Sequence, residues 1–317
     1  MNLLKECTGA KTIGISGHIR PDGDCVGSCM ATALYLRKNM PGVQVDVFLD
    51  PISEVFNCIQ DVDTINHERK ENITYDVFIV MDCEPARTSF SKDDFDAAKK
   101  SINVDHHVTN TGTGDVNYIF PDTGSCAELV YEILDHDKID AEIAKALYIG
   151  IIHDTGVLQY SNTRPETLIT VSELIKYGFD FPNIITSTFY EKTYVQDQIL
   201  GRALLESILF MNGRCVVSMV DRRTMNFYGA DSRDLEGIVN QLRNIKGVDC
   251  AIFMYELAPL QYKVSLRTSE AVDASVVAQV YGGGGHARAA GVTMQGTYHD
   301  AINNLSREIA KQLGEND

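Results

Sequence analysis

The chain has 317 residues, of which 44% are hydrophobic and 23% charged, and its formal net charge at pH 7 is −16. This length and apolar content can bury a sizeable core and favour two domains, which excludes a wholly disordered chain. Long nucleic acid is held mainly by Lys and Arg that neutralise many phosphates, so the acidic charge argues against a long duplex as partner. A short anionic substrate stays compatible with it, because bound metal ions would supply local positive charge.

The start of the chain lacks a signal-peptide pattern, and no stretch of about 18 apolar residues follows, so we expect a cytoplasmic protein with no membrane partner. Eight cysteines form no Cys-x-x-Cys pair, which favours free buried thiols over a disulfide framework. Cys25 and Cys29 could share a helix face, but the sequence offers no matching pair of soft ligands for a zinc site.

Short β-branched runs alternate with helical patterns in the first half of the chain. The runs cover residues 11–16, 43–49, 75–81 and 101–104, and the helical patterns cover residues 25–40, 127–136 and 141–153. This alternation predicts an α/β fold with a parallel sheet. Thr163, followed by Pro165 and Glu166, predicts the start of a further helix with Thr163 as the N-cap. We expect one catalytic domain over residues 1–192.

The pattern changes after about residue 192. Residues 206–211 and 214–221 flank Asn212 and Gly213, a strong hairpin signal, and residues 248–256 and 261–268 predict a second strand pair. Residues 193–205 are expected to form a helical linker, because they lack the Gly, Pro and Ser of a flexible tether. A smaller α+β domain should therefore occupy residues 206–317, with the active site in the cleft between the two domains.

Acidic and imidazole side chains follow the predicted strands. His18, Asp22 and Asp24 lie in a loop directly after the first strand, although such a loop is also typical of an ordinary surface turn. Asp82 follows the apolar run 77–81, where burial of an unpaired carboxylate would cost several kcal/mol. A metal ion would neutralise this carboxylate, and capping of the next turn is the alternative.

Two further segments end in the same kinds of side chain. Asp105, His106 and His107 follow the strand predicted to end at residue 104, and consecutive residues there point in different directions, so the two histidines should have different roles. Asp154 follows a strongly apolar stretch, whereas its neighbour His153 is expected not to touch the site. Ligands of open α/β sheets bind beyond the carboxyl ends of the strands, so these segments could converge on one crevice.

Together these positions supply two imidazoles and four carboxylates, from His18, Asp22, Asp24, Asp82, His106 and Asp154. This set of nitrogen and oxygen donors suits Mn²⁺ better than a thiolate-seeking metal, and four negative ligands would balance two divalent cations. Two ions roughly 3.5–4 Å apart form the clamp of many phosphatases and nucleases. We expect two Mn²⁺ ions, with Mg²⁺ or Co²⁺ as substitutes.

The order of these motifs resembles the DHH/DHHA1 phosphoesterases, and within them the bifunctional oligoribonuclease and pAp-phosphatase branch called nanoRNases. The resemblance extends over nearly the whole chain, including residues 125–132 and 160–167. It implies ligands for two Mn²⁺ ions: His18 and Asp22 for one, Asp24, His106 and Asp154 for the other, and Asp82 bridging. It also implies that His107 faces the scissile phosphate, while Asp105 orients a histidine by a hydrogen bond.

A run of glycines in the second domain precedes His286 and Ala287; it comprises Gly282, Gly283, Gly284 and Gly285. A Walker loop needs Lys and Ser or Thr at the next two positions, so this is not an ATP site. Glycine amides can approach an anion closely, and a helix beginning near His286 would add its positive end. The alternative is a turn that needs glycine only for tight packing. The resemblance implies that His286 and Arg267, in the preceding strand, hold the substrate's phosphate or nucleotide.

The resulting hypothesis is a Mn²⁺-dependent phosphoesterase, monomeric or homodimeric, that hydrolyses short oligoribonucleotides to nucleoside 5′-monophosphates, pAp to AMP and phosphate, or both. The alternatives are a cyclic- or linear-dinucleotide phosphodiesterase, an inorganic polyphosphatase-like enzyme, and a non-catalytic RNA-binding protein that uses a DHHA1-like module. The full set of metal ligands and the net charge of −16 both weigh against the last of these.

Overall fold

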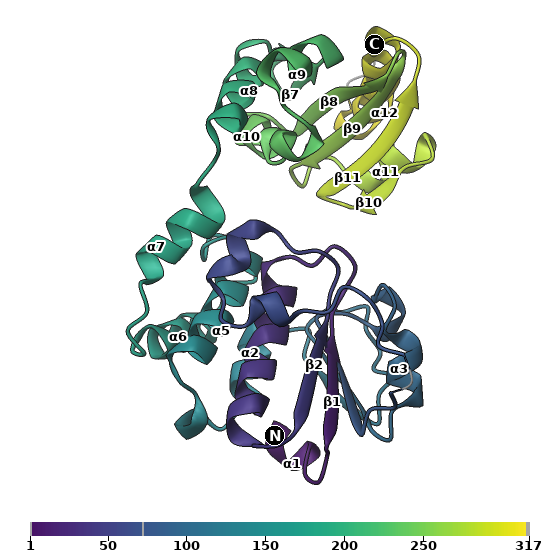
Figure 1. Cartoon of the computed structure of the whole chain (residues 1–317). Coiled ribbons are helices and arrows are strands. Elements are labelled where there is room, and N and C mark those ends of the chain that lie inside the picture. The colour runs from purple at the N-terminus through teal and green to yellow at the C-terminus, as the bar shows by residue number, and fades with distance from the viewer. Residues whose placement is uncertain (1, 72, 315–317) are drawn as a thin grey trace. The chain divides into compact units, whose positions relative to one another are not determined.

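The computed structural model describes residues 2–71 and 73–314, and the chain divides into two compact units, residues 1–191 and 192–317. Each unit is built around its own sheet and its own hydrophobic core (Figure 1). Within the described ranges, no helix combines the length and the apolar character needed to cross a membrane.

The first unit contains a five-stranded parallel sheet in the order β2-β1-β3-β4-β5. Its strands are β1 (Thr12–Ser16), β2 (Gln44–Phe48), β3 (Val77–Met81), β4 (Ser101–Asp105) and β5 (Val116–Ile119). The first four lie where the sequence predicts them, whereas β5 is a short, partly exposed edge strand that the pattern did not indicate. The strand order reverses between β1 and β3, which is the point at which open α/β sheets bind ligands.

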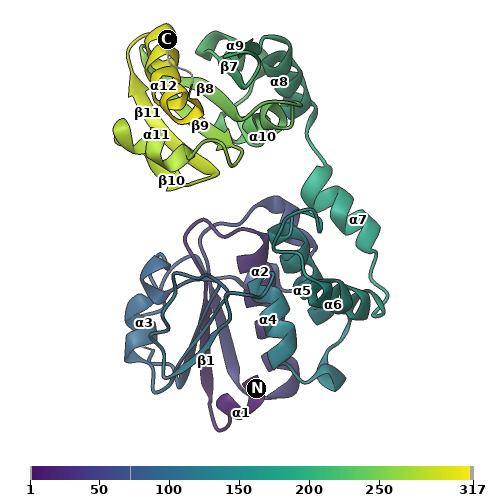
Figure 2. The ribbon, with the colours of Figure 1, turned by 180° about the vertical axis from the view of Figure 1, so that it is seen from behind.

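Helices cover both faces of this sheet. They are α1 (Leu3–Glu6), α2 (Gly23–Asn39), α3 (Lys92–Ala97), α4 (Cys126–Ile133), α5 (Ala141–Asp154), α6 (Pro165–Ile175) and α7 (Phe181–Ile185). Helices α2, α4 and α5 pack together on one face, and α3 packs on the other (Figures 1 and 2). Because both faces are covered, β3 is buried at every position and its sequence is continuously apolar.

Helix α6 begins differently from the prediction. Its N-cap is Arg164, not Thr163, and the Thr167 hydroxyl accepts the Arg164 N–H at 3.2 Å. Arg164 has extended backbone angles because it precedes Pro165, and a residue before proline is disfavoured in the helical region. Its guanidinium donates to the buried Glu128 carboxylate at 2.9 Å, which ties the start of α6 to α4.

The second unit contains a six-stranded mixed sheet in the order β10-β11-β9-β8-β7-β6. Its strands are β6 (Ile208–Phe210), β7 (Cys215–Val220), β8 (Cys250–Ala258), β9 (Gln261–Thr268), β10 (Gly284–His286) and β11 (Ala289–Gln295). Both predicted strand pairs form: β6 and β7 are antiparallel across Asn212 and Gly213, and β8 is antiparallel to β9.

Five helices cover the second sheet: α8 (Tyr194–Leu205), α9 (Arg222–Tyr228), α10 (Ile238–Arg243), α11 (Ala274–Val280) and α12 (Tyr298–Leu313). Helices α11 and α12 pack on one face, and α8, α9 and α10 lie on the other (Figure 2). The prediction of a helix that begins near His286 is wrong. His286 ends β10, which pairs with β11 in a tight hairpin, so Gly282 and Gly283 lie between α11 and this edge strand, and Gly284 and Gly285 belong to it.

Candidate metal centre

The loop between β1 and α2 is fixed by the start of the helix. Asp22 is the N-cap of α2, and its Oδ1 accepts the N–H groups of Asp24 and Cys25, both at 3.1 Å. Gly23 has no room for a side chain, because an added Cβ would lie 2.3 Å from the ring of His153. The packing below the loop therefore explains the glycine between the two acidic residues.

His18 presents one ring nitrogen to the carboxylates. Its Nδ1 donates to the Ile19 carbonyl oxygen at 2.8 Å, which leaves the lone pair of neutral histidine on Nε2. Nε2 lies 3.7 Å from Asp22 Oδ1 and 3.4 Å from Asp82 Oδ2. A histidine with one nitrogen fixed by a carbonyl and the other directed at carboxylates has the usual arrangement of a metal ligand.

Asp82 lies between two imidazoles at the end of β3. Its Oδ2 faces His18, while its Oδ1 is 3.5 Å from His106 Nε2 and 3.7 Å from His107 Nδ1. The backbone of Asp82 has a φ of +58°, and such left-handed conformations of non-glycine residues concentrate at functional sites. The two oxygens of this one carboxylate thus point toward two different groups of ligand atoms.

Asp24 is held by the first turn of α4. Its carboxylate accepts the N–H groups of Cys126 at 2.6 Å and Ala127 at 2.8 Å, so the helix start supplies two donors to a side chain that is only 1% exposed. Asp24 Oδ2 also lies 3.8 Å from His106 Nε2. His106 Nδ1 donates to the Thr123 carbonyl oxygen at 3.2 Å, so this histidine too directs Nε2 at carboxylates.

His107 differs from His106 in what holds its ring. Its Nδ1 donates to Asp105 Oδ1 at 2.7 Å, and the same oxygen accepts the N–H groups of both histidines. Asn110 donates to the other oxygen at 2.7 Å. Although burial alone would raise the pKa of Asp105, these hydrogen bonds hold it below its usual value. Asp105 in turn raises the pKa of His107, which favours a positively charged ring.

Asp154 closes the group at the end of α5. Its Oδ2 is 3.8 Å from His106 Nε2 and accepts a hydrogen bond of 3.0 Å from Asn162 Nδ2. Asn162 also donates to the carbonyl oxygens of Asp154 and Gly124, at 3.2 and 2.8 Å. A left-handed turn through Gly156, Val157 and Leu158 brings the chain back to this position. Asn162 therefore fixes the orientation of a candidate ligand.

The carboxylates of the group are close together and mostly buried, which shifts their pKa values. Burial, together with the charges of Asp82 and Asp154, raises the pKa of Asp24 well above its usual value, and burial raises that of Asp154 to about 6. Burial opposes protonation of His106, yet the surrounding carboxylates raise its pKa to about 10. A divalent cation would remove these preferences, because it stabilises the deprotonated carboxylate and the neutral imidazole.

Two buried atoms support a cation at this position. Among residues 2–71 and 73–314, Asp82 Oδ1 and His106 Nε2 are buried and have no hydrogen-bond partner. Among the described residues, three groups of side chains each bring three potential ligand atoms within 4.8 Å of one another. The groups are His18, Cys25 and Asp82; Asp82, His106 and His107; and Asp24, His106 and Asp154. Asp82 belongs to two of them. The donor set therefore fits metal ions.

His153 lies outside all three groups, as the sequence suggested. Its Nε2 is 3.0 Å from the Thr188 hydroxyl, and its ring packs against Phe56 and Phe189 at centroid distances of 5.1 and 5.6 Å. Burial lowers its pKa to about 4, which keeps the ring neutral. His153 is therefore a packing residue beneath Gly23.

In the second unit, Arg267 and His286 share one row of the sheet. Ala289 on β11 is directly opposite His286 on β10 and directly opposite Arg267 on β9. Residues directly opposite one another in a sheet project from the same face, so the two side chains stand on one face, two strands or about 10 Å apart. The small Ala289 lies between them.

The glycine run has a packing role. An added Cβ at Gly283 would lie 2.5 Å from the Gly291 carbonyl oxygen, and one at Gly285 would lie 2.4 Å from that of Ala289. Gly282 has a φ of +76°, whereas an added Cβ at Gly284 meets no described atom within 4 Å. Tight packing thus explains Gly283 and Gly285, and the left-handed backbone conformation explains Gly282.

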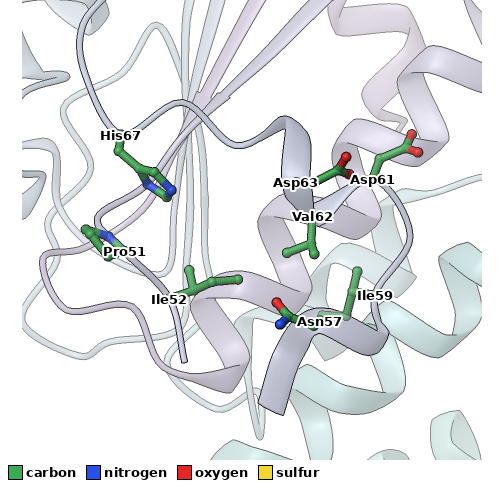
Figure 3. Close-up of a pocket in the computed structure, with 8 residues that line it drawn as sticks. All are labelled: Pro51, Ile52, Asn57, Ile59, Asp61, Val62, Asp63 and His67. Atoms are coloured by element: carbon green, nitrogen blue, oxygen red, sulfur yellow. The ribbon is translucent and has the colours of Figure 1, made fainter. Parts of the chain in front are cut away.

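One hollow in the first unit contains none of the candidate ligands. This pocket has a volume of about 610 Å³ and follows β2 in the chain (Figure 3). Its walls are Pro51, Ile52, Asn57, Ile59, Asp61, Val62, Asp63 and His67. The side-chain chemistry, and not this hollow, identifies the candidate centre.

Comparison with known proteins assigns both units. Residues 12–151 match the DHH family, N-terminal domain, and residues 212–315 match the DHHA1 domain. The chain belongs to the DHH/DHHA1 family. The bifunctional oligoribonuclease and PAP phosphatase NrnA of Bacillus subtilis (strain 168) is 27% identical over 289 residues, which cover 89% of each chain. As a DHH phosphoesterase, the chain is a metal-dependent hydrolase.

Two solved structures share the DHH/DHHA1 fold. An exopolyphosphatase-related protein from Bacteroides fragilis superposes with a TM-score of 0.89 at 23% identity, covering 98% of this chain and 95% of that one. The exonuclease RecJ bound to manganese superposes with a TM-score of 0.50 at 13% identity, covering 99% and 93%. At these identities the likeness concerns the fold alone.

Sequence reasoning missed three residues of the DHH/DHHA1 centre. Asn162 and Asn110 hold Asp154 and Asp105, and Cys25 lies among the potential ligand atoms. The two asparagines carry no spacing that separates them from turn residues. The position of Cys25 one residue after Asp24 was the available signal, but a single soft donor beside hard ones does not specify a metal site.

Proposed function

We propose that this chain is a Mn²⁺-dependent phosphoesterase that hydrolyses short oligoribonucleotides to nucleoside 5′-monophosphates, and pAp to AMP and phosphate. The observation that carries this proposal is the position of Asp82, whose two oxygens face His18 on one side and His106 on the other. A shared carboxylate of this kind is what a centre with two cations requires. The similarity to NrnA supports the substrate class.

The proposed ligands are those that the family resemblance implies, and the distances in the centre are compatible with them. One ion would be held by His18 and Asp22, the second by Asp24, His106 and Asp154, and both by Asp82. Divalent ions at such a centre lower the pKa of water and neutralise charge on phosphate oxygens. The nitrogen and oxygen donors suit Mn²⁺, with Mg²⁺ or Co²⁺ as substitutes.

His107 would act on the substrate and not on a metal ion. Its Nδ1 donates to Asp105, so its other nitrogen is available to a phosphate oxygen. The raised pKa favours a charged ring, which would stabilise the negative charge of the phosphate through a charge-assisted hydrogen bond. Asp105 and Asn110 would keep the ring in this orientation.

Arg267 and His286 would hold the terminal nucleotide of the substrate. A guanidinium and an imidazole on one sheet face, separated by alanine, offer donors to a phosphate and a ring surface to a base. The glycine run, with Gly282, Gly283, Gly284 and Gly285, would shape this surface and not bind a phosphate through a helix start. Gly282 and Gly284 are open enough for direct contact, because an added Cβ at either position meets no described atom within 4 Å.

The function is tested by initial rates with Mn²⁺ on pAp, on the linear dinucleotide pGpG, and on RNAs from two to about twenty nucleotides. We expect the shortest substrates to be cleaved fastest, because a surface with a net charge of −16 gains little affinity from additional phosphates. Chelator should abolish all activity. Faster cleavage of the longest RNA than of a trinucleotide would contradict the proposed specificity.

The anchor is tested separately. Arg267→Ala and His286→Ala should each lower kcat/KM on dinucleotides and pAp by about ten- to a hundredfold. This is the loss expected when a charge-assisted hydrogen bond to the substrate is removed. Bis-p-nitrophenyl phosphate, which has no nucleotide, should be hydrolysed almost as before. Lys263→Ala is a matched control, because Lys263 lies four residues earlier on the same face of β9. Equal losses on both kinds of substrate would refute the anchor.

A further inference from the structure

Cys25 lies at the candidate metal centre. It occupies the first turn of α2, three residues after Asp22, and is fully buried. Its Sγ, a ring nitrogen of His18 and a carboxylate oxygen of Asp82 all lie within 4.8 Å of one another. An added Cβ at Gly17 would lie 2.2 Å from this Sγ, so the sulfur fills the space directly after β1. Small shifts would bring all three donors to one ion.

Asp82 is the second buried residue of this group. Its side chain is 3% exposed, and its Oδ1, which has no hydrogen-bond partner within the described ranges of the chain, faces His106 and His107 on the other side of the centre. Its Oδ2 faces His18 Nε2 at 3.4 Å, and in the neutral ring that nitrogen would carry the lone pair, because Nδ1 donates to the Ile19 carbonyl oxygen. A buried carboxylate beside a ring lone pair and a sulfur is stabilised when a cation joins them.

We propose that Cys25 Sγ ligates the same ion as His18, Asp22 and Asp82, which gives one half of the centre a mixed nitrogen, oxygen and sulfur ligand set. This inference rests on the proposed function, because it concerns one ion of the metal centre described there. Sulfur donors select softer ions than carboxylates do, so this half suits Zn²⁺ or Co²⁺ as well as Mn²⁺. The metal–sulfur bond replaces the S–H bond, and the proton leaves to solvent.

Cys29 is the matched control. It lies one helical turn after Cys25 and is equally buried. It belongs to none of the groups of potential ligand atoms in the described part of the chain. Replacement of Cys29 by serine therefore makes the same chemical change, at the same depth in the same helix, without removing a proposed ligand.

The test loads the full chain with Co²⁺ and records its absorption spectrum. Wild type and Cys29→Ser should show a near-ultraviolet sulfur-to-cobalt charge-transfer band, and Cys25→Ser should lack it. In the wild type loaded with Zn²⁺, X-ray absorption should detect a sulfur neighbour at about 2.3 Å. Cys25→Ser should weaken Zn²⁺ binding at least about tenfold, because even the loss of a residue that only hydrogen-bonds to a metal ligand lowers metal affinity by about that factor. Mn²⁺ binding should weaken less.

The outcomes separate this inference from the proposed function. If the wild type binds two Co²⁺ ions without the charge-transfer band, Cys25 is not a ligand, although the metal centre stands. If the wild type binds no divalent ion, the proposed function itself fails. If Cys25→Ser does not fold, the X-ray absorption of the wild type decides alone: a sulfur neighbour supports the inference, and only nitrogen and oxygen neighbours overturn it.

Discussion

Asn162→Ala should weaken metal binding without unfolding the protein. Asn162 Nδ2 donates to Asp154 Oδ2 at 3.0 Å, and it also holds the backbone carbonyl groups of Asp154 and Gly124. Alanine removes all three hydrogen bonds and leaves the Asp154 carboxylate free to rotate away from His106. The change alters the orientation of a proposed ligand but removes no ligand.

The magnitude follows from the exposure of Asp154. A hydrogen bond to a charged group is worth about 1.5–3 kcal/mol. Because the Asp154 side chain is 27% exposed, water can replace part of the lost interaction, which favours the lower end of this range. About 1.5 kcal/mol corresponds to a roughly tenfold weaker affinity for one ion. Turnover at saturating Mn²⁺ should fall less than the affinity, because the missing group touches no substrate.

Isothermal titration with Mn²⁺ and activity as a function of Mn²⁺ concentration measure the two effects. Asn39→Ala is the control, because the Asn39 side chain donates only to backbone carbonyl groups of Tyr35 and Lys138 in the described structure. An Asn162→Ala variant that binds two Mn²⁺ ions as tightly as the wild type would refute the reasoning. So would an equal loss of affinity in both variants.

The remaining predictions concern single residues. Asp82→Ala should reduce turnover more than any other ligand variant, because both of its oxygens face imidazoles, and wild-type turnover at saturating Mn²⁺ would contradict this. His107→Ala should lower kcat by about ten- to a hundredfold while metal analysis still finds two ions. Gly285→Ala should lower the melting temperature, because its Cβ would meet a backbone oxygen of β11, and Gly284→Ala should not. Burial lowers the pKa of His153 from 6.5 to about 4, so the unfolded chain binds the proton more tightly and stability should fall as the pH drops through this window. Urea unfolding of His153→Gln should show a weaker dependence on pH there.

Much of the first unit could be predicted because its signals are local. Buried strands of a parallel sheet are continuously apolar, so the residue after each strand is recognisable, and Asp82 and Asp105 lie at such ends. The different roles expected for His106 and His107 follow from the alternation of side chains, and their rings indeed have different partners, a carbonyl oxygen and a carboxylate.

The parts that could not be predicted depend on backbone geometry or on distant contacts. Asn162 reaches Asp154 only because a left-handed turn reverses the chain, and a β-branched residue such as Val157 gives no sign of a positive φ. The helix at His286 was expected because glycine-rich loops that bind anions often lead into a helix. The contact of Gly283 with β11 shows that the glycines serve a hairpin, which depends on pairing and not on the local pattern.

The distribution of the metal centre over three strands and two helices also constrains when it can form during synthesis. A nascent chain that has exposed β1 and the start of α2 already contains His18, Asp22 and Asp24, whereas His106 and Asp154 emerge much later. Parallel pairing of β1 with β3, and of β3 with β4, requires crossover connections, which close slowly. A chain that lacks β3, β4 and α5 therefore contains too few of the candidate ligands to complete the centre, which can form only once α5 has docked onto the finished sheet.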